Sequence, residues 1–227
     1  MYIFVVIQKL CNHLLCIIIK EKSMKLFVVT LSLMCSLLIP MTAFSAETTP
    51  IQLSLFHPAQ LFPKETKVYG LRINLLYGIN DEMIGIDLGL INKTTGLTQG
   101  LQLGLFPLGG INITEELEGI QFSGFYGGAN IANGNVSGMQ ISGLLAGYNK
   151  AYDLQGIQIA GIFVGANLAK NVDGIQLASL YNKAEEIKGL QIGIVNACNK
   201  MKGVQLGLVN IIKDSAPVFL PIINARF

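Results

Sequence analysis

A short phrase occurs nine times between Gly70 and Asn210, and it constrains this chain more than any single residue does. It reads Gly, aliphatic, Gln, aliphatic, small residue, further apolar residues and usually Asn, most clearly in Gly189–Asn196 and Gly203–Asn210. The other copies open at Gly70, Gly85, Gly100, Gly119, Gly138, Gly156 and Gly174. Self-similarity at such short intervals predicts an array of one structural unit.

The side chains within each copy alternate in character. In Gly100–Leu105 the leucines fall on one face, and Gln and Gly fall on the other. A period of two predicts β-strands, because successive side chains of a strand point to opposite faces. The fold class is therefore all-β, with one continuous aliphatic face and one face that carries Gln and small residues.

The connectors between copies share a pattern of their own. They run from Asn to the next opening Gly, as in Asn149–Gly156, Asn182–Gly189 and Asn196–Gly203, and their tips are polar. Asn and Gly suit tight turns because both tolerate positive φ. In the central copies the extra residues lie before the Asn, so that Gly138–Asn149 is four residues longer than Gly189–Asn196 while the connector keeps its length.

Two architectures fit these strands. One is an antiparallel meander that closes into a β-barrel of about ten strands; the alternative is a parallel β-solenoid. The four added residues favour the meander, because its strands can lengthen together, whereas one side of a solenoid coil would need a bulge. The uniform connectors favour the solenoid, and so do Arg72 and Asp87, which occupy the Gln position in adjacent copies and would meet in parallel stacking.

The end of the sequence favours the barrel. Alternation runs back from Phe227 through Ala225 and Ile223, as in the final strand of outer-membrane barrels, which commonly ends in an aromatic recognised by the assembly machinery. We therefore expect a barrel whose aliphatic face meets lipid. Its interior would hold an Arg72–Asp87 ion pair and the glutamines Gln102, Gln121, Gln140, Gln158, Gln176, Gln191 and Gln205.

The first 46 residues are expected to be a leader. Residues 24–46 contain a basic start, an apolar run and a small-residue cleavage site, which is the pattern of a secretory signal peptide. Met1–Ile19 is a second apolar stretch, and we expect translation to begin at Met24. Residues 47–69 are a Pro-containing lead-in, and residues 70–227 are the β repeat domain.

The composition points away from several functions. Without the leader the chain holds 12 basic and 13 acidic residues, so no basic surface suggests nucleic acid. His57 and Cys198 are the only His and Cys beyond the leader, too few for a metal set or a Ser-His-Asp arrangement. The sequence predicts no catalytic, cofactor-binding or metal site, and hence no enzyme.

The repeated phrase resembles that of the bacterial surface repeat-containing proteins, an exported and largely uncharacterised family. The resemblance covers roughly Gly70–Asn210 and is most specific at Gly189–Asn210. It implies placement in the outer membrane or at the cell surface. We expect a structural or surface-exposed role with membrane lipid and the assembly machinery as partners, and a narrow pore as one option. The alternative is a soluble or surface-attached solenoid that serves as a binding module.

Overall fold

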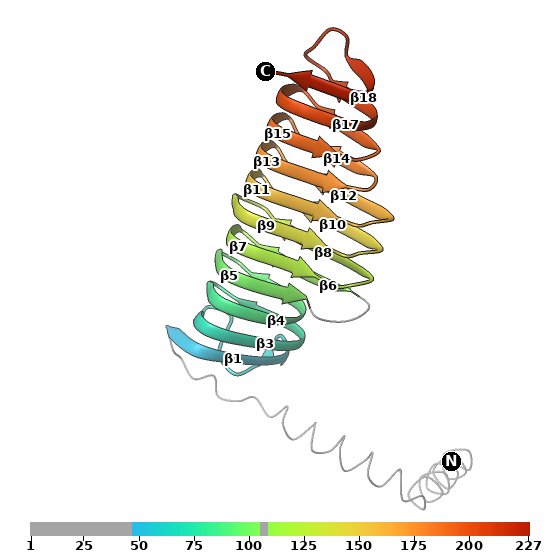
Figure 1. Cartoon of the computed structure of the whole chain (residues 1–227). Helices are drawn as coiled ribbons and strands as arrows, with labels where there is room; N and C mark the ends of the chain where they lie inside the picture. The colour runs from blue at the N-terminus through green and yellow to red at the C-terminus, as the bar shows by residue number, and fades with distance from the viewer. Residues whose placement is uncertain (1–46, 105–108) are drawn as a thin grey trace, which may run out of the picture. The chain divides into compact units, whose positions relative to one another are not determined.

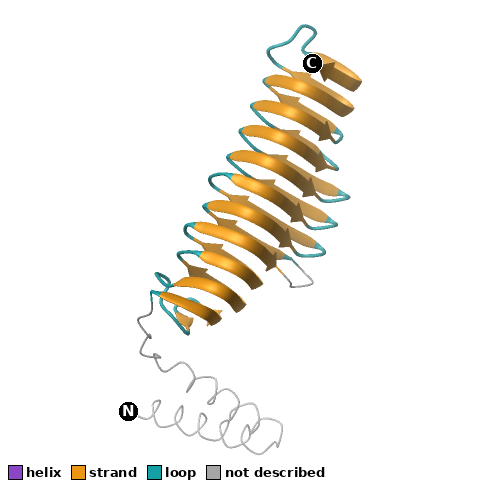
Figure 2. Cartoon of the chain, turned by 60° about the vertical axis from the view of Figure 1, so that its left-hand side comes forward, coloured by secondary structure: helices purple, strands orange, loops and turns teal. Residues whose placement is uncertain are grey.

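The computed structural model describes residues 47–104 and 109–227, which form a parallel β-solenoid. The leader, the proposed Met24 start and the apolar Met1–Ile19 stretch lie outside these residues. Each copy of the repeated phrase opens one coil, and the coils stack along a common axis (Figures 1 and 2). The all-β prediction is confirmed.

One side of the stack is built from β1 and the nine strands that carry the phrase. These are β1 (Thr48–Phe56), β3 (Lys67–Asn80), β4 (Met83–Thr94), β5 (Leu97–Gly104), β7 (Glu116–Ser123), β9 (Val136–Ser142), β11 (Asp153–Ala160), β13 (Asn171–Ala178), β15 (Glu186–Ile192) and β17 (Lys200–Ile212). From β4 onward they pair in parallel with no offset, so that Gly189 lies beside Gly174 and Gln191 beside Gln176.

The other side holds the strands that end each phrase. These are β6 (Gly110–Thr114), β8 (Gly127–Ala132), β10 (Ala146–Lys150), β12 (Val164–Leu168), β14 (Tyr181–Lys183) and β16 (Val195–Cys198), together with the second halves of β3, β4 and β17. Two strands run antiparallel to their neighbours: β2 (Ala59–Gln60) against β1, and β18 (Phe219–Arg226) against β17.

The stacking of the coils requires a glycine at the first position of each phrase. Gly189 has φ 138°, a conformation that side chains with a Cβ rarely adopt. A Cβ at this position would lie 2.0 Å from the backbone oxygen of Gly174 in the preceding coil. The same relation holds between Gly174 and Gly156. Glycine therefore recurs because only glycine lets successive coils approach to sheet distance there.

The interior is divided into an apolar strip and a polar strip. Leu117, Val136, Leu154, Val172 and Ile187 stack beneath the connectors and form the main buried hydrophobic cluster. The rest of the interior holds amides: the Gln column of one side faces the Asn column of the other, and all of these side chains are fully buried. The aliphatic residues of the phrase point outward.

The predicted barrel is wrong. Repeated strands pair in parallel with the next coil, not antiparallel with the next strand in sequence, so transmembrane β-strands and an outer-membrane barrel are excluded for this fold. No helix among the described residues is long and apolar enough to cross a bilayer. The parallel solenoid, which was the alternative, is the structure.

The longer central copies explain why the sequence favoured a barrel. Only part of their added length extends a strand: β8, β10 and β12 start earlier than β14 does, with Gly127, Ala146 and Val164 paired in register. The rest leaves the coil at its edge and returns, and neighbouring coils do the same. Leu144 N–H donates to the Phe125 oxygen (2.7 Å), and Val164 N–H donates to the Leu145 oxygen (2.9 Å). Because the lengthened coils are consecutive, their excursions stack on one another and the opposite side of each coil need not change.

The Pro-containing lead-in belongs to the solenoid. β1 pairs in parallel with β3 and forms the first rung of the sheet. The backbone that follows covers the end of the polar interior: Gln52 exchanges hydrogen bonds with the Phe62 backbone, and Asn80 donates to the Pro63 and Thr66 oxygens. This segment satisfies amides that would otherwise end without a partner.

Candidate functional site

The buried glutamines form a continuous hydrogen-bonded ladder. Each Gln donates from Nε2 to Oε1 of the Gln in the preceding coil, as Gln158 does to Gln140 (2.8 Å). The ladder contains Gln102, Gln121, Gln140, Gln158, Gln176, Gln191 and Gln205. All seven residues that the sequence placed inside a barrel thus lie inside the solenoid.

An asparagine ladder runs beside it in the opposite direction. Each Asn donates from Nδ2 to Oδ1 of the Asn in the following coil, as Asn149 does to Asn167 (2.9 Å). The same Nδ2 also donates across the interior, for example to the Ile159 oxygen (2.7 Å). Asn therefore links the two sides of the solenoid as well as successive coils, which explains why it ends most copies.

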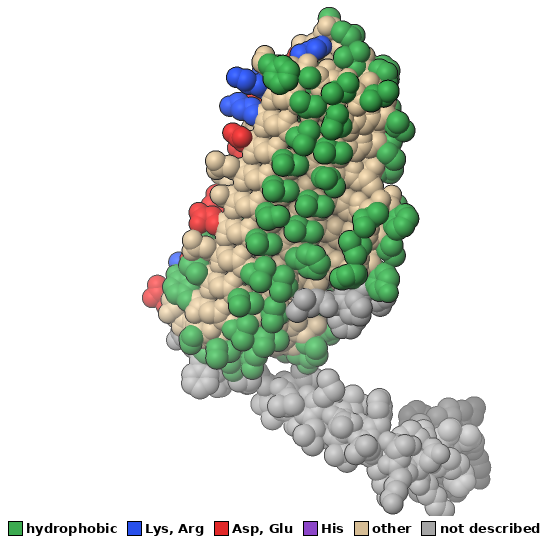
Figure 3. Space-filling view, in the orientation of Figure 1, with side chains coloured by type: hydrophobic (Ala, Val, Ile, Leu, Met, Phe, Trp, Pro, Cys, Tyr) green, Lys and Arg blue, Asp and Glu red, His purple; other side chains and the backbone are tan. Residues whose placement is uncertain are grey.

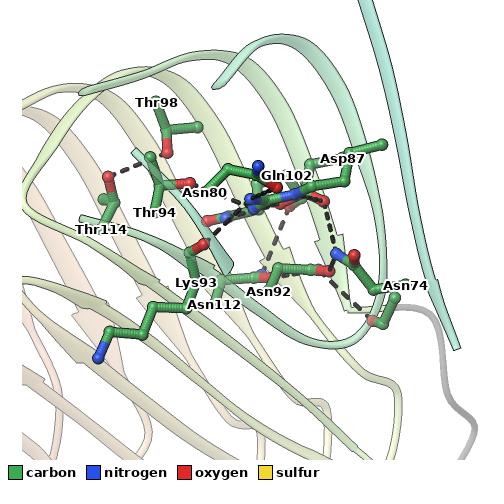
Figure 4. Close-up of polar contacts among 12 residues, drawn as sticks. Asn74, Asn80, Asp87, Asn92, Lys93, Thr94, Thr98, Gln102, Asn112 and Thr114 are labelled. Atoms are coloured by element: carbon green, nitrogen blue, oxygen red, sulfur yellow. Dashed lines mark hydrogen bonds and ion pairs between the residues drawn. The ribbon is translucent and has the colours of Figure 1, made fainter. Parts of the chain in front are cut away.

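Arg72 and Asp87 terminate the glutamine ladder with a buried ion pair. Arg72 Nε and Nη2 donate to the two oxygens of Asp87 at 2.8 and 2.6 Å, and both side chains are fully buried. Asp87 also accepts from Gln102 (2.8 Å) and Asn74 (3.0 Å) (Figure 4). The remaining Arg72 nitrogen, Nη1, donates to the Lys93 backbone oxygen. The pair is matched in charge and saturated with hydrogen bonds.

These interior residues are structural. They are sealed from solvent, and the ladders and the ion pair use nearly all of their polar atoms on one another; Asn74 Oδ1 and Gln205 Oε1, at the two ends of the ladders, are exceptions. Buried networks whose members are hydrogen-bonded in this way specify one packing arrangement. The seven glutamines, Arg72 and Asp87 therefore set the register of the coils and offer nothing to a ligand.

No catalytic grouping occurs among the described residues. The hydroxyl of Ser54 donates to the Tyr77 backbone oxygen, while His57 contacts Tyr77 ring edge to face. No group of three or more His, Cys, Asp or Glu side chains in the described part could hold a metal ion. Burial raises the pKa of the Cys198 thiol to about 11, helped by Asp214, so this cysteine is protonated and unreactive at neutral pH.

The exterior carries the feature with functional potential. On the side built by the phrase, the residues before and after each Gln point outward and form two aliphatic columns, which we call the broad face. One column runs through Leu101, Ile120, Met139, Ile157 and Ile175, and the other runs through Leu103, Phe122, Ile141, Ile159 and Leu177. Figure 3 shows these columns as lines of hydrophobic side chains along the molecule, with charges gathered at one edge.

The composition of the broad face is uniform. From β1 to β17 it presents two residues per rung over ten rungs, and every one is Leu, Ile, Val, Met or Phe. Its members are half-buried by their neighbours above and below; Ile86 is 46% exposed and Ile120 is 39% exposed. The sequence predicted this outward aliphatic face, but it assigned the face to lipid around a barrel.

Phe227 was predicted to be an assembly signal. It follows β18 and is 98% exposed, so it contributes nothing to packing. Sequence reasoning missed a second exterior feature, the apolar edge made by the added residues of the central copies. The signal was the clustering of aromatics in Phe125-Tyr126 and Phe163.

A comparison with models of known protein families, with curated proteins and with solved structures finds no match.

Proposed function

We propose that this chain is an exported β-solenoid that acts as an interaction module and binds an apolar partner through its broad face. The single observation behind this proposal is the uncharged aliphatic composition of that face over ten rungs. At ~4.8 Å per rung the face is about 43 Å long, and its twenty side chains, each roughly a third exposed, offer an area on the order of 1,000 Å². Patches of this size on soluble proteins are commonly binding sites.

Folding of the solenoid does not require an apolar broad face. The interior is closed by the amide ladders and the strip around Leu154, so the outward residues are not needed to fill a core. Stacking of aliphatic side chains between rungs adds some stability, as cross-strand pairs do in other sheets. A water-facing sheet could obtain the same stability from stacked Thr side chains or from paired charges, yet these columns contain neither Thr nor a charged residue. Parallel sheets are normally covered on both faces.

Export is part of the proposal. It is supported by the signal-peptide pattern of residues 24–46 and by the resemblance of Gly189–Asn210 to surface repeat-containing proteins. An exported module would present its faces outside the cytoplasm, either free or attached to the cell surface. The proposed role is binding and not catalysis.

The test is site-specific photocrosslinking in the producing cell. A photoreactive phenylalanine analogue would replace Ile86 or Ile120 on the broad face, and Lys183 on the opposite side would serve as the matched exposed control. We expect a discrete adduct of constant mass from both broad-face positions and none from the control. Absence of an adduct above the Lys183 level at both positions would refute the proposal.

Export is tested on the same cells. The mass of the purified chain should correspond to removal of residues up to Ala46, and external protease should reach the connectors only if the chain is on the surface. An unprocessed chain retained in the cytoplasm would contradict the proposed location.

A further inference from the structure

The coils form a step along one edge. In the coils opened by Gly119, Gly138 and Gly156 the Asn follows eleven residues after the Gly, but in the Gly189 and Gly203 coils it follows after seven. Four residues that go out and return extend a coil by about 7 Å at ~3.3 Å per residue. The longer coils therefore project beyond the shorter ones.

The projecting part is an ordered apolar ridge. Its outermost residues are Phe125, Tyr126, Leu144, Leu145, Ile162 and Phe163, which we call the ridge; they are between 41% and 70% exposed. Its backbone is bonded from coil to coil, as by Ile162 N–H to the Leu144 oxygen and Ala146 N–H to the Tyr126 oxygen. The ridge is thus a fixed shape that presents aromatic and aliphatic side chains to the outside.

The next three coils form a matching recess. Their edge residues Leu180, Ile194 and Leu208, which we call the recess, are 40%, 45% and 66% exposed. A groove of about 660 Å³ runs from the ridge residues Leu144 and Ile162 past Ile194 and Leu208 to Ile222. No charged residue occurs in the edge segments of these six coils. In Figure 3 hydrophobic side chains follow the edge opposite the charges.

Ridge and recess are related in a way that suits two copies of the chain. Within the residues that the structure describes, each spans three coils, and they meet between the Gly156 coil and the Gly174 coil. A half-turn about an axis normal to the broad face, placed at this boundary, would bring the ridge of one copy onto the recess of the other. A two-fold contact requires such self-complementarity. We propose that the protein forms a two-fold homodimer through this edge, with both broad faces on the same side.

The area is sufficient for a stable dimer. The nine ridge and recess side chains, each 40–70% exposed, offer roughly 800 Å² per copy if a large apolar side chain has about 150–200 Å² of surface. Standard interfaces bury about 800 Å² per partner. The contact would bury two phenylalanines per copy and no charge, as the centres of stable interfaces do.

The symmetry pairs particular coils. Leu145 on the ridge would face Ile194 in the recess, because each belongs to the middle coil of its group. A Leu145→Glu variant and an Ile194→Lys variant should each weaken the dimer about 100-fold, as charges at the centre of an interface do. A mixture of the two should recover association to within about tenfold, because one contact is then unaltered and the other joins Glu to Lys.

Sedimentation velocity measures the association of the wild type, the variants and the mixture. The chain is purified from the producing cell and studied over a wide concentration range. Ile86→Glu is the matched control: it places the same charge on a residue of equal exposure on the broad face. We expect a dimer for the wild type and the control, monomers for each edge variant, and a heterodimer for the mixture. Circular dichroism verifies that all variants retain the β fold.

Four results would overturn the proposal: a wild type that is monomeric at every concentration, a Leu145→Glu variant that still dimerises, dissociation by Ile86→Glu, and no heterodimer in the mixture. Binding of a monomer to phosphatidylcholine vesicles through the ridge would identify the edge as a lipid contact instead. This inference is independent of the proposed function, because crosslinking at the broad face can fail while the edge dimer persists.

Discussion

Replacing Asp87 alone by Gln should destabilise the solenoid strongly, whereas replacing Arg72 and Asp87 together by Gln should not. Both residues stand at the position that holds Gln in each later copy. The single Asp87→Gln change leaves the guanidinium of Arg72 fully buried without a counter-ion. The double change would let the ladder continue by the same amide contacts that link Gln121 to Gln102.

The magnitudes follow from the burial of the pair. Breaking a buried ion pair by removing one partner costs about 3–5 kcal/mol, because a desolvated charge is left behind. Replacing both members by neutral groups of suitable shape is commonly neutral or even stabilising. The coupling energy between Arg72 and Asp87 should therefore be on the order of 3 kcal/mol, well above the ~0.5 kcal/mol seen for independent sites.

A double-mutant cycle measures this coupling. The wild type, Arg72→Gln, Asp87→Gln and the double variant would be unfolded in guanidinium chloride, followed by far-ultraviolet circular dichroism. Because solenoid coils can melt in groups, hydrogen exchange of the β3 and β4 amides provides a local measurement of the same free energies. A matched exposed change, Asp173→Gln, should alter stability by less than about 0.5 kcal/mol.

Two results would refute this reasoning. If Asp87→Gln costs less than ~1 kcal/mol, the guanidinium is not desolvated in the folded chain. If the double variant loses the sum of the two single losses, the residues do not interact, and the ladder does not extend into the β3–β4 coils.

Three further outcomes are expected. Gln158→Ala should cost about 3 kcal/mol in chemical unfolding, because Gln140 Oε1 loses its donor and Gln176 Nε2 loses its acceptor. The exposed Gln155→Ala should cost almost nothing, and equal losses for the two variants would contradict the ladder. Gly174→Ala should cost at least about 2 kcal/mol, since its φ is 147° and a Cβ would meet the Gly156 oxygen; a neutral change would show that the coils are not so close. Cys198 should resist thiol reagents below pH 9 in the folded chain, and rapid labelling at pH 8 without denaturant would contradict its burial. Because burial raises the pKa of this thiol from 9.0 to about 11, the stability that it contributes is present below pH 9 and is lost as pH rises towards 11.

Much of the local structure could be predicted from the residues. The alternation in Gly100–Leu105 identified strands and assigned the faces, with Gln102 inside and Leu101 and Leu103 outside. The shared position of Arg72 and Asp87 indicated parallel stacking, and the structure pairs them in that register. This observation was outweighed by the added residues of Gly138–Asn149, which were assumed to lengthen a strand.

Of the two candidate surfaces, one could be predicted from the sequence and the other could not. The broad face was predicted as an aliphatic face because period-two alternation is a local property. The ridge and its recess could not be predicted, because their shape depends on which coils lie side by side. Phe125, Leu144 and Ile162 are far apart in sequence and become one surface only when consecutive excursions stack.

By itself the sequence determined the unit: a strand with amides on one side, aliphatic residues on the other and a glycine at its start. The direction in which one unit meets the next was decided only in three dimensions. Antiparallel and parallel neighbours make equal use of the same alternating strand, so no local pattern distinguishes them. The hydrogen bonds between amides of successive coils, and the clearance at the stacked glycines, exist only in the parallel arrangement, and they select it.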